Sequence, residues 1–236
     1  MRVKFTELSL SLSEKELDEA VQNASLFLGA YEVLREQSKT PLSALLETAD
    51  DLTEWDHVPP KDAYDPVSRS QYFYHCHSKD ECLDGEHGHL HFFVGSDITS
   101  EIKSKIKASS DHTQITGKNL THIGGIAINE ASVPVALFTT NFWVCGDSWH
   151  SSNITAELSK NFRIDLDSPS REVNNWVTGL VRFSLPYFAE LLKLRDQVIK
   201  EAQITPEDFS VYSNKEIEVP SAYKFDFAKE LANLSS

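Results

Sequence analysis

Five of the nine histidines lie between positions 75 and 91, and their spacing limits what this stretch can form. In a β-strand, side chains at positions i, i+2 and i+4 point to the same face. His75 and His77 therefore share one face of a strand, and His87, His89 and His91 share one face of another. The spacing predicts two strands that each carry a row of imidazoles.

The residues around the histidines favour this interpretation. Aromatic side chains precede the first set at Tyr72–Tyr74 and follow the second at Phe92–Phe93, and aromatic residues are common in strands. The segment between the two sets is polar and ends in the turn sequence Asp84-Gly85. We therefore expect an antiparallel pair of strands whose histidine faces come together.

Rows of imidazoles are typical of metal sites. Neutral imidazole binds zinc, copper, iron and nickel; three histidines suit catalytic zinc, whereas two histidines and a carboxylate suit non-haem iron. Glu86 is the nearest carboxylate, but alternation places it opposite His87 unless it lies in the turn. The candidate ligands for a divalent transition metal (iron, zinc or copper) are His75, His77, Glu86, His87, His89 and His91. The sequence leaves open whether the cluster also includes His57, His122 or His150.

Two alternatives to a metal site on strands stay open. His87 and His91 would also share a helix face at i, i+4, although Gly88 and the aromatic residues that follow favour a strand. The imidazoles could also form a purely structural, pH-sensitive cluster, because bunched histidines repel one another when protonated.

The charge balance excludes some partners. The chain has 22 Lys and Arg against 36 Asp and Glu, which gives a net charge of −14. Nucleic acids and anionic membranes are bound by basic patches, and the sequence has none.

The sequence also has no apolar run long enough for a signal peptide or a membrane span. Its three cysteines lack the spacing of a disulfide framework. We expect a cytoplasmic protein that binds neither nucleic acid nor membrane, with its oligomeric state open.

Helices are expected on both sides of the histidine region. The capping-box pattern of Ser13 and Glu16 predicts a helix over 14–37, and Thr40-Pro41 begins a second one. The apolar stripe predicted to face the core of the first helix is Leu17, Val21, Ala24, Leu28 and Tyr31. A short helix is expected over 153–160. A long one should follow with Ser168 as cap and Pro169 first, and Pro186 should kink or break it.

The chain is expected to form one domain over 1–236. Its predicted parts are a helical segment 13–49, an acidic loop 50–70, a sheet core 71–145, a helical segment 153–202 and a tail 203–236. Within these, further strands are expected over 119–129, with a bulge at Gly124-Gly125, and over 135–144. Short helices are expected over 98–106 and at Pro206, and an edge strand over 216–219. The fold class is α+β: a mostly antiparallel sheet of about four or more strands, packed by N-terminal and C-terminal helices.

Three segments of the chain resemble a bacterial family of unknown function. They are Glu86-His-Gly-His-Leu-His-Phe-Phe93, then Leu137-Phe-Thr-Thr-Asn-Phe-Trp-Val144 with Gly146, and the region 176–196. The family pattern is Tyr-His-x-His, Glu-His-Gly-His-x-His and Leu-Phe-Thr-Thr-Asn-x-Trp-Val. The resemblance would cover residues 15–200. It implies one domain and adds no mechanism.

The sequence thus predicts a metal-binding protein with a histidine-rich site and leaves open whether it is an enzyme. As an enzyme, it would carry out oxidation at iron, or hydrolysis through a metal-activated water, on a small-molecule substrate. The alternative is a non-catalytic module that uses the histidine face to bind metal or another protein.

Overall fold

The structure, a computed structural model, describes residues 3–49, 53–78, 80–97, 99, 114–115, 119–205 and 207–233. Its centre is a six-stranded antiparallel sheet in the order β1-β2-β3-β5-β6-β8. The strands of this sheet are β1 (Val58–Asp65), β2 (Ser70–His75), β3 (Gly88–Gly95), β5 (Leu120–Ile128), β6 (Pro134–Thr139) and β8 (Ser221–Lys224). A small second sheet pairs β4 (Gln114–Ile115) with β7 (Trp149–His150).

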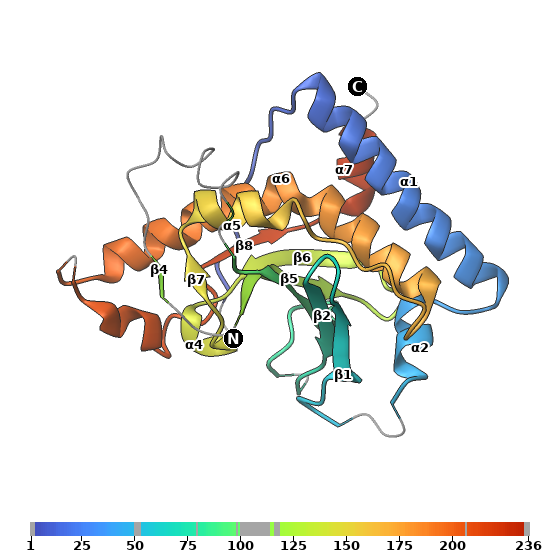
Figure 1. Ribbon diagram of the computed structural model, residues 1–236, viewed down its shortest axis with the longest axis horizontal. Coiled ribbons are helices and arrows are strands. Elements are labelled where there is room, and N and C mark those ends of the chain that lie inside the picture. Colours follow the sequence, from blue (N-terminus) through green and yellow to red (C-terminus); the bar gives the residue numbers. More distant parts are fainter. Residues whose placement is uncertain are drawn as a thin grey trace.

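Helices from both ends of the chain accompany the sheet. They are α1 (Glu14–Glu36), α2 (Pro41–Leu46), α4 (Phe142–Cys145), α5 (Ser152–Ser159), α6 (Arg171–Ala202), the 3₁₀ helix η1 (Phe209–Ser213) and α7 (Phe227–Asn233). Figure 1 shows α6 lying along one side of the sheet, with α1 on the same side. The predicted α+β class is confirmed. Within the described ranges, no helix has the length and apolar character needed to cross a membrane.

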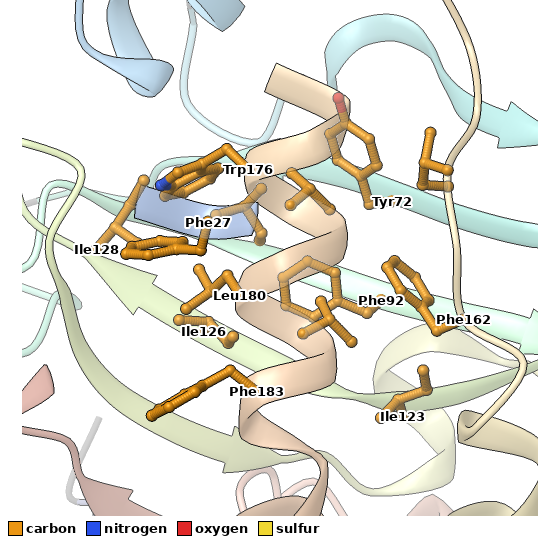
Figure 2. Close-up of a cluster of buried hydrophobic side chains, with 14 of the residues drawn as sticks. Phe27, Tyr72, Phe92, Ile123, Ile126, Ile128, Phe162, Trp176, Leu180 and Phe183 are labelled. Atoms are coloured by element: carbon orange, nitrogen blue, oxygen red, sulfur yellow. The ribbon is translucent and has the colours of Figure 1, made fainter. Parts of the chain in front are cut away.

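Alternation along the strands separates a helix-facing side from a histidine side. Leu90 and Phe92 of β3 are fully buried in the core that α6 shares with the sheet, and Figure 2 shows Phe92 and Leu180 in this layer. His89 and His91 alternate with them and so point to the opposite face. Because a slip of one residue would turn the histidines into this apolar core, the packing of α6 fixes which way they point.

The predicted bounds of α1 and its capping box at Ser13 are confirmed, but the predicted core stripe is correct only in part: Ala24 is buried and Tyr31 packs against the core. Val21 and Leu28 are 46% and 44% exposed, and the buried residues are Ala20, Ala24, Phe27, Ala30 and Leu34. The reason is a close helix crossing at Gly179 of α6, where an added Cβ would lie 2.6 Å from the backbone nitrogen of Phe27. Alanines allow this approach, whereas larger side chains would hold the two helices apart.

The segment 50–70 is not the continuous loop that the sequence predicted, because it contains β1. The loop was predicted because the segment contains Pro59 and Pro60, and proline has no backbone N–H to donate to a neighbouring strand. Among the described residues, β1 pairs with β2 alone and forms the edge of the sheet, so its backbone needs hydrogen bonds to a neighbouring strand on one side only.

The predicted strand over 135–144 is wrong beyond Thr139, because the chain turns into α4. Asn141 caps this helix, its side-chain oxygen accepting the N–H of Phe142 at 2.8 Å, and Gly146 ends it at φ 65°. The edge strand predicted over 216–219 also lies elsewhere. It is β8, at Ser221–Lys224, which pairs with β6.

The long helix α6 begins two residues later than predicted and continues through Pro186 without a break. Its cap is Ser170, whose Oγ accepts the N–H of Val173 at 3.0 Å. Phe183 and Phe188 on either side of Pro186 are buried, and this packing holds the helix together where one backbone bond is lost. The short helix expected over 153–160 is confirmed as α5. The helix predicted over 98–106 falls almost wholly outside the described residues, as does Pro206.

Candidate metal centre

Strands β2 and β3 bring three histidines together on the sheet face that points away from α6. His75 stands directly opposite His89 in the β2–β3 register, and His91 stands opposite Phe73. One donor atom from each of His75, His89 and His91 lies within 4.8 Å of the others. The three residues are 8%, 9% and 3% exposed. This group could hold a metal ion.

The closest contact in the group joins the Nε2 atoms of His75 and His89, which are 2.7 Å apart. Two nitrogen ligands at 2.0–2.1 Å from a tetrahedral ion lie roughly 3.3 Å apart. A small separation of the two rings would therefore admit an ion between them.

Glu86 fixes the orientation of His89. Its Oε1 lies 2.6 Å from Nδ1 of His89, and its Oε2 accepts the backbone N–H of Leu83 at 2.8 Å. Burial is the largest single effect and acts to raise the pKa of Glu86, but the hydrogen bonds from His89 and the Leu83 backbone, together with the neighbouring His89 and His77, outweigh it and the pKa is lowered. An ionised Glu86 accepts the Nδ1 proton, so the lone pair of His89 lies on Nε2, toward His75. Carboxylates hold metal-ligating histidines in this way.

Two imidazoles of the site, those of His75 and His91, are neutral at physiological pH. Burial, and then the neighbouring His89 and His77, lower the pKa of His75 to about 2. Burial and the adjacent His122 lower the pKa of His91 well below its ordinary value. A neutral imidazole offers a nitrogen lone pair, which is the form that binds metals.

His77 lies beside the group. Its Nε2 is 3.4 Å from Nε2 of His75, and its Nδ1 is 3.7 Å from a carboxylate oxygen of Glu81. Trp55 covers it, with ring centroids 3.9 Å apart. His77 is therefore placed to serve as a further ligand.

His87 and His57 take other partners. Nδ1 of His87 bonds the hydroxyl of Tyr74, a core residue, at 2.6 Å. The ring of His57 stacks on Phe73 at 3.6 Å, and its Nδ1 contacts Asp62 at 2.8 Å. Neither belongs to the donor groups found among the described residues.

A β-bulge brings His122 to the histidine face. The β3–β5 register shifts between Phe92 and Phe93, so that Ile123 of β5 is an extra residue. Without it, His122 would point toward α6. With it, Nε2 of His122 lies 2.9 Å from Nδ1 of His91. The predicted bulge at Gly124-Gly125 lies next to this position, but the sequence alone did not show which residues it would reorient.

Cys145 was not among the predicted site residues, yet it forms a second donor group with His91 and His122. It reaches the histidine face because β6 ends early and α4 turns back. Its Sγ lies 4.0 Å from Nδ1 of His91. His150 lies elsewhere, buried and paired with Gln114 between β7 and β4.

The first histidine group lies against a cavity of about 160 Å³. Its lining includes Trp55, Phe138 and Val219 and the carboxylates Glu81 and Glu218. No lysine or arginine is among the described residues that line it. A small neutral or cationic molecule fits this lining better than an anion does.

No curated protein and no solved structure matches the chain. One family model does, and it covers residues 21–225, which is most of the sequence. The chain belongs to this family, described as a domain of unknown function (DUF6969).

Proposed function

We propose that this protein binds a divalent transition metal through His75, His89 and His91. The observation that carries the proposal is the convergence of three buried imidazoles, one of them oriented by the carboxylate of Glu86. Contacts between ring nitrogens link His75 to His77 and His89, and His91 to His122. Without an ion, several of these nitrogens would compete for few hydrogen-bond partners.

Zinc and copper fit the donor set better than iron does. The group consists of imidazoles, and its nearest carboxylate, Glu86, is engaged by Nδ1 of His89 and the backbone of Leu83. Non-haem iron sites commonly use two histidines and a carboxylate, whereas three histidines are a known zinc set.

We further propose that the protein is a metal-dependent enzyme that hydrolyses a small neutral or cationic molecule. A metal ion held by three histidines keeps a position for water or substrate and supplies Lewis-acid chemistry. The cavity beside the group gives a substrate access, and Glu81 and Glu218 in its lining are candidate proton acceptors.

A non-catalytic metal-binding role is the second candidate, and His77 favours it. Nε2 of His77 lies 3.4 Å from Nε2 of His75, so His77 could occupy the fourth coordination position of the metal ion. A tetrahedral ion with four protein ligands has no place for water and is typical of structural sites.

Elemental analysis of protein purified without an affinity tag tests the metal proposal. We expect at least one equivalent of zinc or copper in the unchanged protein, and the loss of one equivalent in His75→Ala and in His89→Ala. His87→Ala is the matched control, because His87 bonds Tyr74 instead, and it should keep its metal. No metal in the unchanged protein, and no uptake when it is added, would overturn the proposal.

Azide binding separates the two roles. In the Co(II)-loaded protein, an open position would let azide bind and change the visible spectrum. A spectrum insensitive to azide in the unchanged protein, but sensitive in His77→Ala, would assign the fourth position to His77 and overturn the enzymatic proposal.

A further inference from the structure

We propose a second metal position next to the first, held by His91, His122 and Cys145. It rests on the proposed function in one respect, because it shares His91 with the first group. One donor atom from each of these three residues lies within 4.8 Å of the others. The centre would therefore be dinuclear.

The donor distances suit one ion. Nδ1 of His91 lies 2.9 Å from Nε2 of His122 and 4.0 Å from Sγ of Cys145. Around a tetrahedral ion with metal–nitrogen distances of 2.0–2.1 Å and a metal–sulfur distance near 2.3 Å, the corresponding spans are roughly 3.3 Å and 3.6 Å. Shifts of about half an ångström in the side chains satisfy both.

Thr140 positions His122 as Glu86 positions His89. Its Oγ1 lies 3.0 Å from Nδ1 of His122 and 3.8 Å from Sγ of Cys145. When the hydroxyl oxygen accepts the Nδ1 proton, the lone pair of His122 lies on Nε2, toward His91. Each group thus contains a histidine whose Nδ1, the nitrogen turned away from the proposed ion, is hydrogen-bonded to an oxygen. Metal-ligating histidines commonly have such a partner.

His91 lies between the two groups. Its ring centroid is 5.0 Å from that of His89 and 5.0 Å from that of His122. Its Nδ1 faces the second group, and the proposal therefore assigns its Nε2 to the first. With both ions bound, His91 would have to give up its ring proton to serve both groups, and Cys145 would give up its thiol proton. Both protons pass to solvent.

The chemistry of the second position differs from that of the first. A thiolate with two imidazoles is a softer donor set that suits zinc or copper. The cavity at this position measures only about 20 Å³ and is lined by His122, Thr140, Cys145 and Asp147 among others. That is room for one water molecule. The second ion would therefore be closed to substrate and would act on the first ion through His91.

Titration of the metal-free, untagged protein with Co(II) tests the proposal, because a thiolate bound to Co(II) adds a near-ultraviolet charge-transfer band. We expect the unchanged protein to take up two equivalents and show the band. Cys145→Ala should take up one equivalent and lose the band. Cys82→Ser is the matched control: Cys82 is in neither donor group, so this variant should keep both. Thermal melts of each apoprotein check the fold.

The outcomes separate this inference from the proposed function. A variant with both His75→Ala and His89→Ala should lose the first equivalent but keep the band. A single equivalent without the band in the unchanged protein would overturn the second position and leave the first intact. A band that survives Cys145→Ala would also overturn it. Loss of both equivalents and of the band in Cys145→Ala would overturn the assignment of two separable positions.

Discussion

Glu86 and His75 contact opposite ends of the His89 imidazole. Oε1 of Glu86 lies 2.6 Å from Nδ1 of His89, and Nε2 of His75 lies 2.7 Å from Nε2 of His89. The carboxylate therefore acts on the site through His89. Glu86 determines which nitrogen of His89 carries the proton, and it holds the His89 ring so that Nε2 faces His75. The sequence suggested Glu86 as a ligand, and this arrangement leads us to propose a positioning role for it instead.

Replacing Glu86 with glutamine should weaken metal binding about 10- to 100-fold, because loss of an outer partner of a ligating histidine has effects of this size. The amide oxygen can still accept the Nδ1 proton, but without the negative charge. Competition against a chromophoric chelator measures the change. Glu19→Gln is the control: Glu19 lies on α1, is half exposed and is 3.7 Å from Lys15, and we expect little effect. If Glu86→Gln abolished binding altogether, Glu86 would be a ligand itself.

The stability of the metal-free protein should fall as the pH drops below about 6.5, the ordinary pKa of histidine. Burial first, then His89 and His77, lower the folded-state pKa of His75 to about 2. Burial and the Arg195 guanidinium lower that of His122 to about 3. Between these values and 6.5 the unfolded chain binds protons that the folded chain does not, so lower pH favours unfolding. Above 6.5 both states are neutral at these histidines and their contribution is constant.

Urea unfolding of the chelator-treated protein between pH 7.5 and pH 5.5 measures this dependence. Most carboxylates stay ionised in that range, so the histidines dominate the slope. A variant with His75→Phe and His122→Phe should show a shallower slope. A free energy of unfolding that does not change across the range would contradict the lowered pKa values.

The alternation of residues in strands was enough to predict that three histidines of the candidate site would come together. His75, His89 and His91 lie on one face because β2 and β3 keep strict period-two geometry. His87 precedes β3, where the alternation no longer applies, and it bonds Tyr74. His122 could not be assigned, because its direction depends on the one-residue bulge at Ile123.

Cys145 could not be predicted for a different reason. The run that follows Pro134 is apolar and aromatic enough to read as a continuous strand through Val144. The cap at Asn141 ends that pattern and redirects the chain. The prolines of β1 hid an edge strand in the same way. In both cases the prediction used only the residues of the segment itself. The strands that pack beside the segment, which decide its structure, are known only from the assembled sheet.

The cap of α6 offers a test of a helix start that the sequence placed two residues early. Ser170→Ala removes the oxygen that accepts the N–H of Val173 at 3.0 Å and should cost about 1 kcal/mol of the free energy of unfolding. Ser168→Ala changes the predicted cap, which is exposed, and should stay within about 0.5 kcal/mol. Chemical denaturation of both variants measures the difference. Equal effects, or a larger effect at Ser168, would contradict the observed cap.

The contact between α1 and α6 can be tested with two glycine-to-alanine changes that should have opposite signs. Gly179→Ala places a Cβ 2.6 Å from the backbone nitrogen of Phe27 and 2.8 Å from the carbonyl oxygen of Asn23. Because backbone atoms cannot move aside singly, α1 must shift as a whole, and we expect a loss of about 1–3 kcal/mol. Gly29→Ala is the control. A Cβ there meets nothing within 4 Å, and alanine in a helix should stabilise the fold by about 0.5–1 kcal/mol. Thermal and urea unfolding measure both. A neutral Gly179→Ala would mean that the two helices do not cross this closely, and that the alanine face of α1 has another cause.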